Sequence, residues 1–128
     1  MSTTATAKVT AAVTWFEIPV ADIDRATRFY ETVLDTRLKE FNDGGPMRIF
    51  PAEEGSTTGA LVHRPPMKPS MNGTTVYLHC PSDLAAAMAR VAPAGGSIVV
   101  PQTPVPGEKG HFFVLRDTEG NHVGVHKP

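Results

Sequence analysis

The run Trp15-Phe16-Glu17-Ile18-Pro19-Val20 decides the fold, because a similar run returns 60 residues later as Thr75-Val76-Tyr77-Leu78-His79-Cys80. Each run is followed, two residues further on, by a residue suited to cap a helix, Asp22 in the first copy and Ser82 in the second. A repeat of this size indicates two similar units that pack against each other. Their shared surface is a natural place for a small ligand, so the repeat bears on function as well as on fold.

The residues after each run predict the same order of elements, β-α-β-β-β, in both copies. Apolar residues alternate in the strands and recur at helical spacing after each cap. The first copy predicts strands over 13–20, 37–41, 47–51 and 59–64 and a helix over 23–34. The second predicts strands from 74 and over 97–100, 111–116 and 121–126, with a helix over 83–92. We therefore expect an α+β fold of two tandem modules.

Proline and glycine mark the boundaries of these modules. The stretch 65–73 holds three prolines and a glycine and is predicted to link a module over 13–64 to one over 74–127. Residues 1–12 are rich in Thr and Ala and are predicted to be a flexible N-terminus ahead of a single domain over 13–127.

Composition excludes several classes of function. The chain has 12 Lys and Arg against 13 Asp and Glu, without a basic stripe, which argues against nucleic-acid or membrane partners. Cys80 is the single cysteine, so neither a disulfide framework nor a thiolate metal cluster is expected. No segment reads as a signal peptide or a membrane span, and the location predicted from this is cytoplasmic.

Two motifs at the ends of the repeat resemble a known family. The opening motif is Phe16-Glu17-Ile18-Pro19-Val20-x-Asp22-x-x-Arg25-Ala26-x-x-Phe29-Tyr30-x-x-Val33-Leu34, and the closing motif is Phe113-x-x-x-Asp117-x-x-Gly120-Asn121. Together they resemble the vicinal oxygen chelate superfamily of glyoxalase I, bleomycin-resistance proteins and extradiol dioxygenases, and most of all its small bacterial glyoxalase-like members. The resemblance implies paired modules that form an open curled barrel around a pocket, often in a homodimer.

The chain departs from this family where the family binds its metal. The resemblance puts the four ligand positions, which are His, Glu or Gln in the family, on Trp15, Gly59, Thr75 and Gly124. None of these side chains is a usual ligand of a catalytic divalent metal. We therefore predict no metal and no other cofactor.

Candidate ligand-binding residues come from the strand faces turned away from the helices. Side chains alternate between the two faces of a strand, and the resemblance implies that the face away from the helices lines the pocket. The residues on that face chosen as candidates are Trp15, Glu17, Tyr77, His79, His122 and His126. Such a pocket could stack a planar ligand on the two aromatic rings and orient it by hydrogen bonds. The alternative is that the rings plug the barrel and the polar groups satisfy each other at its rim.

Glu17, His79 and His122 are the candidate catalytic residues. Glu17 could serve as a general base or as an anchor for a ligand amine or hydroxyl, or it could pair with Arg48 or lie at the rim. The three together could also form a substitute metal site of two histidines and a carboxylate, although no motif spacing supports it.

Two functions stay open on this evidence. One is a metal-free protein that binds a small organic molecule; the other is a lyase or isomerase of the glyoxalase type that uses acid–base chemistry or the substitute metal site.

The loop 101–110 could form a lid with Gly107 and Gly110 as hinges, or it could be a stiff proline-rich connection.

Overall fold

The computed structural model describes residues 11–128, so the predicted flexible segment 1–12 falls almost wholly outside the described residues. The elements follow in the order β1 (Trp15–Pro19), α1 (Ile23–Leu34), β2 (Lys39–Phe41), β3 (Met47–Ile49), β4 (Thr58–Val62), β5 (Tyr77–His79), α2 (Leu84–Val91), β6 (Ser97–Pro104), β7 (His111–Arg116) and β8 (His122–Lys127). The predicted order β-α-β-β-β is confirmed in both halves of the chain.

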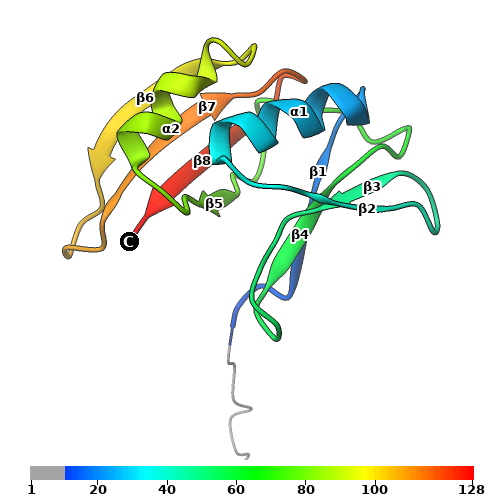
Figure 1. Ribbon diagram of the computed structural model, residues 1–128, viewed down its shortest axis with the longest axis horizontal. Helices are drawn as coiled ribbons and strands as arrows, with labels where there is room; N and C mark the ends of the chain where they lie inside the picture. Colours follow the sequence, from blue (N-terminus) through cyan, green and yellow to red (C-terminus); the bar gives the residue numbers. More distant parts are fainter. Residues whose placement is uncertain (1–10) are drawn as a thin grey trace, which may run out of the picture.

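Each half forms a four-stranded mixed sheet of the same topology. The strand orders are β1-β4-β3-β2 and β5-β8-β7-β6, with β1–β4 and β5–β8 parallel and the remaining pairs antiparallel. Figure 1 shows α1 and α2 next to each other at the top of the molecule, with one sheet descending on either side. The sheets spread apart below the helices without closing, which confirms an open, glyoxalase-like α+β architecture.

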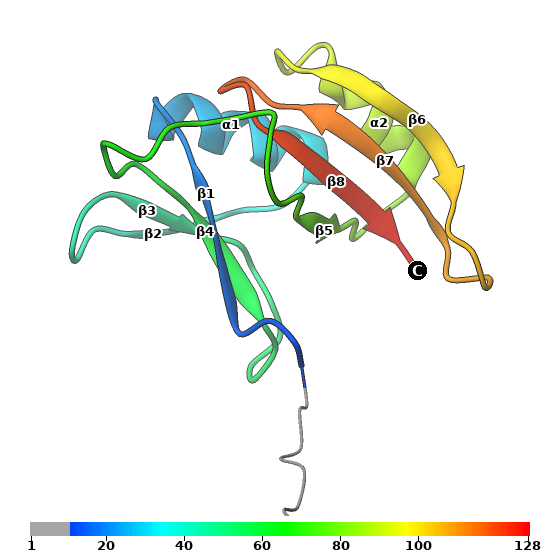
Figure 2. The same ribbon diagram turned by 180° about the vertical axis from the view of Figure 1, so that it is seen from behind.

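One hydrophobic core joins the two halves. Phe29, Tyr30 and Val33 of α1 belong to the same buried cluster as Phe113 and Leu115 of β7. The rings of Phe29 and Tyr30 meet edge to face, with centroids 5.0 Å apart. Burial of this shared apolar surface stabilises the pairing of the halves, since each buried aromatic side chain contributes about 2 kcal/mol. The view from behind in Figure 2 shows α1 lying between β1 and β8.

The helix caps confirm one prediction and correct another. Asp22 caps α1 as predicted, and its side chain accepts a hydrogen bond from the Arg25 N–H over 3.0 Å. The cap of α2 is Asp83, which accepts from the Ala86 N–H over 3.2 Å, so the prediction of Ser82 was wrong. A helix that begins at Leu84 directs Leu84, Ala87 and Val91 into the core, and the residue before it then becomes the cap.

The segment predicted as a loop over 101–110 is partly a strand. β6 continues through Pro101 to Pro104, and its pairing with β7 shifts register between Ile98 and Val100 and again between Val100 and Thr103. β6 is an edge strand, and an edge strand tolerates proline because one side of its backbone has no ladder partner. The turn is therefore short, and the Val105 N–H donates to the Gly110 carbonyl across it over 2.8 Å.

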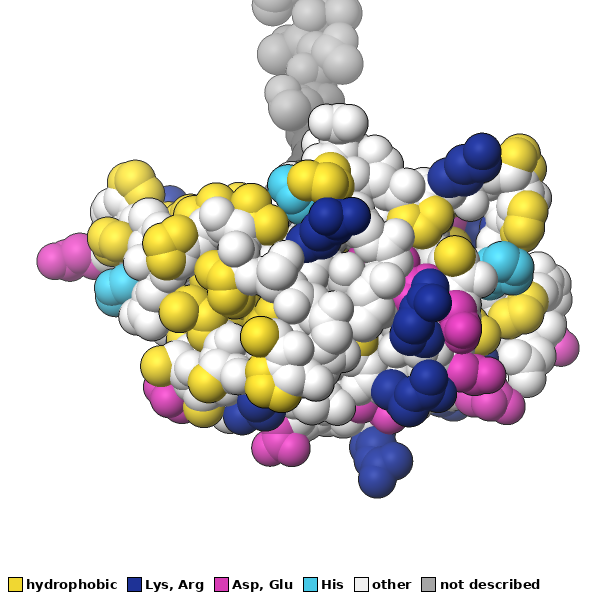
Figure 3. All heavy atoms as spheres, turned by 90° about the horizontal axis from the view of Figure 1, so that it is seen from above, with side chains coloured by type: hydrophobic (Ala, Val, Ile, Leu, Met, Phe, Trp, Pro, Cys, Tyr) yellow, Lys and Arg dark blue, Asp and Glu magenta, His cyan; other side chains and the backbone are white. Residues whose placement is uncertain are grey.

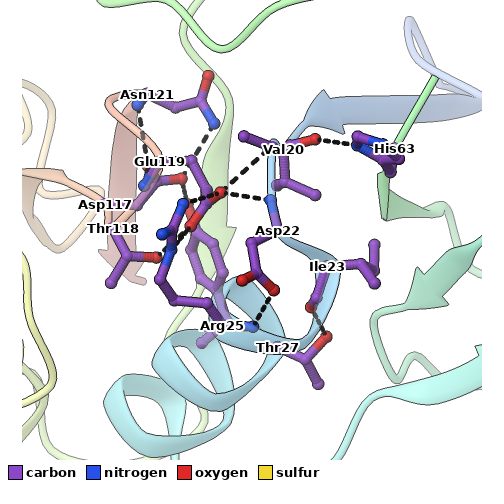
Figure 4. Close-up of polar contacts among 12 residues, drawn as sticks. Val20, Asp22, Ile23, Arg25, Thr27, His63, Asp117, Thr118, Glu119 and Asn121 are labelled. Carbon is purple, nitrogen blue, oxygen red and sulfur yellow. Dashed lines mark hydrogen bonds and ion pairs between the residues drawn. The ribbon is translucent and has the colours of Figure 1, made fainter. Parts of the chain in front are cut away.

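Glu119 ties the second half to the start of α1 (Figure 4). Its carboxylate accepts hydrogen bonds from the backbone N–H groups of Ala21 and Asp22, over 3.0 and 2.8 Å, and a two-pronged ion pair from Arg25, over 2.7 and 2.9 Å. Burial raises the pKa of this carboxyl, but the hydrogen bonds from Arg25, Asp22 and Thr118 outweigh it and lower the pKa from 4.5 to about 2. Glu119 thus supplements the N-terminal cap of a helix in the other half.

A second buried link runs through Asp117. This carboxylate accepts from the Tyr30 hydroxyl over 2.6 Å and from the Asn121 side chain over 3.1 Å. Asn121 in turn donates to the Pro19 carbonyl and accepts from the Ser70 N–H. Burial raises the pKa of Tyr30 well above its usual value, and the charge of Asp117 and the hydrogen bond from Tyr30 to Asp117 act in the same direction. Two residues of the closing sequence motif, Asp117 and Asn121, therefore make polar contacts between the two halves.

Figure 3 shows the surface on the helix side, and on it the basic and acidic side chains are not separated into patches of one sign. Basic and acidic side chains lie next to one another over one half, and hydrophobic side chains gather over the other. No helix within residues 11–128 has the length and apolar character needed to cross a bilayer.

Candidate ligand-binding site

The two copies of the repeated run lie at neighbouring sheet edges. β1 pairs with β4 alone and β5 with β8 alone within the described residues, so each strand ends its own sheet. Figures 1 and 2 both show β5 between β8 and the β1–β4 pair, facing the space where the sheets diverge. The repeat therefore brings Trp15 and Tyr77 to the same opening.

A cavity of about 920 Å³ occupies this opening. Its wall is mainly apolar and aromatic, with a rim of hydroxyl groups. The lining residues are Val13, Trp15, Phe16, Leu34, Thr36, Phe50, Pro51, Ala52, Glu53, Ser56, Thr57, Thr58, Thr74, Thr75, Val76, Tyr77, Leu78, His79 and Pro81. Trp15 is 41% exposed and Tyr77 is 51% exposed, so much of each ring remains free for contact. A cavity of this size and composition is typical of small-molecule sites.

Trp15 is held in place by a charged pair behind it. Its indole N–H donates to Glu17 over 3.1 Å, and the other oxygen of Glu17 pairs with Arg64. The pairing of Glu17 with Arg48 that we considered is wrong, because Arg48 pairs with Asp24 and Glu40 over 3.4 and 3.2 Å. Glu17 does not line the cavity, and both its oxygens are engaged. Its contacts orient the indole.

Tyr77 lies across a glycine of the neighbouring strand. Tyr77 and Gly124 are register partners in β5 and β8, and any Cβ at Gly124 would overlap the tyrosine ring. The ring also meets Phe112 edge to face, with centroids 5.5 Å apart. Gly124 therefore makes room for the aromatic side chain that lines the cavity.

The predicted histidines are not gathered at the cavity. His79 lines it and is exposed, whereas His122 and His126 are absent from its wall. His122 Nε2 is buried and has no hydrogen-bond partner among the described residues. His126 Nε2 donates to the Lys109 carbonyl over 2.7 Å, which ties the β6–β7 turn to β8. No residue of 101–110 lines the cavity.

The residues at the family's metal positions do not fit a metal. Within residues 11–128, no three His, Cys, Asp or Glu side chains are grouped so that they could hold an ion. An indole nitrogen donates a proton and offers no lone pair, and Thr75 is a weak oxygen donor. A Cβ at Gly59 would overlap Phe16, and a Cβ at Gly124 would overlap the Tyr77 ring. Neither glycine position therefore leaves room for a ligating side chain. The candidate set of Glu17, His79 and His122 is likewise not grouped.

A second hollow, of about 360 Å³, lies on another part of the surface. It is lined by Gly95, Gly96, Ser97 and the segment Arg116–Gly120. Asp117 and Glu119 contribute to its wall, but their carboxylates already accept the hydrogen bonds that join the two halves. The aromatic cavity is larger and retains unoccupied aromatic faces, so we take it as the candidate site.

Several wall residues were not anticipated from the sequence. Glu53 belongs to a stretch, 53–55, that the sequence predicts only as a turn, and Ser56 and Thr57 fall between this turn and the next predicted strand. Thr36 follows the end of α1. No periodic pattern marks these residues. Their place in the wall depends on the path of the segment between β3 and β4, which local sequence does not predict.

Comparison with known proteins agrees with this architecture. The model of the glyoxalase/bleomycin resistance protein/dioxygenase superfamily matches residues 12–125. The chain belongs to this superfamily. The family resemblance carried by the two motifs is thereby confirmed. Members of the superfamily differ widely in chemistry, so membership alone does not assign a reaction.

Individual relatives in the superfamily are similar over nearly the whole chain. "Putative glyoxylase CFP32" of Mycobacterium bovis and of Mycobacterium tuberculosis is 31% identical over 121 residues, or 93% of this chain. The chain spans 45% of the length of these relatives.

Solved structures share the fold at lower identity. A glyoxalase/bleomycin resistance protein from Albidiferax ferrireducens T118 aligns with a TM-score of 0.68 at 18% identity, covering 92% of this chain and 99% of its own. TnmS3, an antibiotic binding protein from Streptomyces sp. CB03234, aligns with a TM-score of 0.61 at 22% identity, covering 95% and 99%.

Proposed function

We propose that this protein binds a small, flat organic molecule in the cavity between β1 and β5, without a resident metal. The observation that carries the proposal is the pair of half-exposed rings, Trp15 and Tyr77, in the wall of a cavity of about 920 Å³. Stacking on exposed aromatic rings is worth about 0.5–1.5 kcal/mol beyond the area buried, so two rings give a substantial anchor.

The surrounding groups support binding with a few directional contacts. Thr36, Ser56, Thr74 and Thr75 line the cavity and make no side-chain hydrogen bond within residues 11–128. They can donate to or accept from polar atoms of a ligand. TnmS3, which has the same fold, is described as an antibiotic binding protein, and this fits a binding role for the scaffold here.

The alternative is a lyase or isomerase that relies on acid–base chemistry. His79 alone among the predicted catalytic residues lines the cavity, so it is the one candidate for a proton transfer to a bound molecule. Glu17 is occupied by Arg64 and Trp15 and would need to break an ion pair to act as a base. These contacts favour the binding proposal over the catalytic one.

Trp15 is the only tryptophan in the chain, so its fluorescence reports on the cavity directly. Titration with flat three-ring compounds should quench this fluorescence with saturation at micromolar concentrations. Tyr77→Ala should weaken binding about tenfold, because one stacking face and its buried area are lost. Phe41→Ala is the matched control, since Phe41 is 40% exposed but lies outside the cavity. Equal losses in both variants would contradict the proposed site.

Metal content is tested separately on the purified protein. We expect elemental analysis after dialysis to find well under one equivalent of zinc, nickel or iron per chain. A near-stoichiometric metal that is lost in a Glu17/His79/His122 triple variant would refute this part of the proposal. It would favour the substitute metal site and the lyase or isomerase alternative.

A further inference from the structure

We infer that the cavity selects flat ligands that carry a positive charge, and that Glu53 is the residue that recognises this charge. The inference rests on the proposed function and adds a chemical class to it. Its basis is the distribution of charge in the cavity wall.

The wall contains one carboxylate and no basic side chain among the described residues. Glu53 supplies the carboxylate, and no Lys or Arg lines the cavity. Glu53 forms no ion pair within residues 11–128, although Glu17, Asp24, Glu40 and Glu119 all do. Its negative charge is therefore left for a ligand, and Tyr77 and His79 are the other ionisable side chains in the wall.

The aromatic rings act in the same direction. The face of an indole or phenol ring attracts a cation through its quadrupole, and tryptophan is the strongest of these rings. Trp15 donates its N–H to Glu17, and donation to a carboxylate increases the electron density of the ring. Both rings and Glu53 thus favour a cation, and nothing in the described wall carries a fixed positive charge to favour an anion.

Three probes of one scaffold test the inference: 10-methylacridinium (cation), 10-methylacridone (neutral) and acridine-9-carboxylate (anion). Binding is measured by calorimetry at one pH and low salt. We expect the cation to bind roughly tenfold more tightly than the neutral compound, from the ring faces and Glu53 together, and the anion to bind most weakly. Added salt should lower the affinity of the cation and leave the affinity of the neutral compound unchanged.

Variants identify the residue responsible. Glu53→Gln should lower the affinity of 10-methylacridinium about two- to fivefold and leave that of 10-methylacridone unchanged, because a partly exposed charge pair is modest in strength. Glu54→Gln is the matched control, since Glu54 is the adjacent carboxylate and does not line the cavity. It should change neither affinity.

The outcomes separate the two proposals. If 10-methylacridone binds as tightly as 10-methylacridinium, the charge preference is overturned while the binding function stands. If Glu54→Gln weakens the cation as much as Glu53→Gln does, the assignment to Glu53 is overturned. If none of the three compounds binds and a wider panel of flat compounds does not quench Trp15, the binding function itself fails.

Discussion

At the scale of single residues, glycines and their neighbours shape the candidate site. Gly124 has no side chain, and the Tyr77 ring occupies the space in which a Cβ would stand. Gly59 has the same relation to Phe16 in the first sheet. Each sheet therefore has a glycine whose parallel partner is an aromatic residue of the edge strand, although the 60-residue offset of the repeat matches Phe16 to Val76 and not to Tyr77.

We expect Gly124→Ala to destabilise the fold by about 1–3 kcal/mol, because the added methyl group forces the Tyr77 ring to move. Ligand binding should weaken as well, since Tyr77 lines the cavity. The control is the same substitution in a Tyr77→Ala background, where the cost should largely disappear. Urea denaturation of the four proteins measures the coupling, and an equal cost in both backgrounds would rule out this explanation.

At the scale of elements, the start of α2 shows how packing chooses between two adjacent capping residues. Ser82 and Asp83 are both suitable caps, and the buried positions of Leu84, Ala87 and Val91 place the helix start after Asp83. The Ser82 hydroxyl is then buried, and it has no hydrogen-bond partner among the described residues.

The two residues should respond differently to removal of their side-chain oxygens. Asp83→Ala should lower the free energy of unfolding by about 1 kcal/mol through loss of the cap. Ser82→Ala should be close to neutral or slightly stabilising, since an unsatisfied buried hydroxyl is removed. Chemical denaturation of the two variants checks the difference, and a larger loss in Ser82→Ala would restore Ser82 as the cap.

At the scale of the whole molecule, the contacts of Glu119 and Asp117 join the two halves. Glu119 reaches residues 94 to 98 positions earlier in the chain. Its pKa is lowered to about 2 in the folded protein, whereas the unfolded chain has the usual value of 4.5. The stabilisation is therefore fully present above about pH 4.5 and is lost as the pH falls toward 2.

Glu119→Gln should destabilise the protein by about 2 kcal/mol at pH 7, given that Arg25 is half exposed and the pair is partly screened. The difference in free energy of unfolding between this variant and the unchanged protein should shrink as the pH is lowered through 4 and 3. Urea denaturation between pH 7 and 3 measures this difference. Glu108→Gln, at an exposed residue without an ion pair in the described structure, is the control. A difference that stays constant with pH would show that the charge of Glu119 does not stabilise the folded protein.

We also expect a homodimer in solution. β2 and β6 end the two sheets away from the cavity, and Phe41 of β2 and Ile98 and Val99 of β6 are exposed. Uncovered strand edges and apolar faces of this kind favour association. Light scattering at micromolar concentration should give about twice the chain mass of 13.7 kDa. A mass of one chain at every concentration up to 100 µM would exclude the dimer.

The paired strands and helices of this protein could be predicted from sequence, because alternation and helical spacing record which side chains are buried locally. Ile18 in β1, Val20 directly after it, and Phe29 and Val33 in α1 are buried as their spacing indicated. Proline in an edge strand misled the prediction for β6, since the tolerance of Pro101 depends on which strand lies beside it. Asp22 could be predicted as a cap because the capping contact is local.

The sequence by itself determined the repeat, the element order and the family, because local spacing and short motifs carry this information. Tertiary structure alone decided that Glu17 pairs with Arg64, that Glu119 caps a helix of the other half, and that Glu53 joins Trp15 and Tyr77 in one cavity wall. These contacts connect segments whose distance is set by the packing of α1 and α2 between the two sheets. Periodicity records which face of an element is buried, but it carries no information about which distant side chain that face will meet.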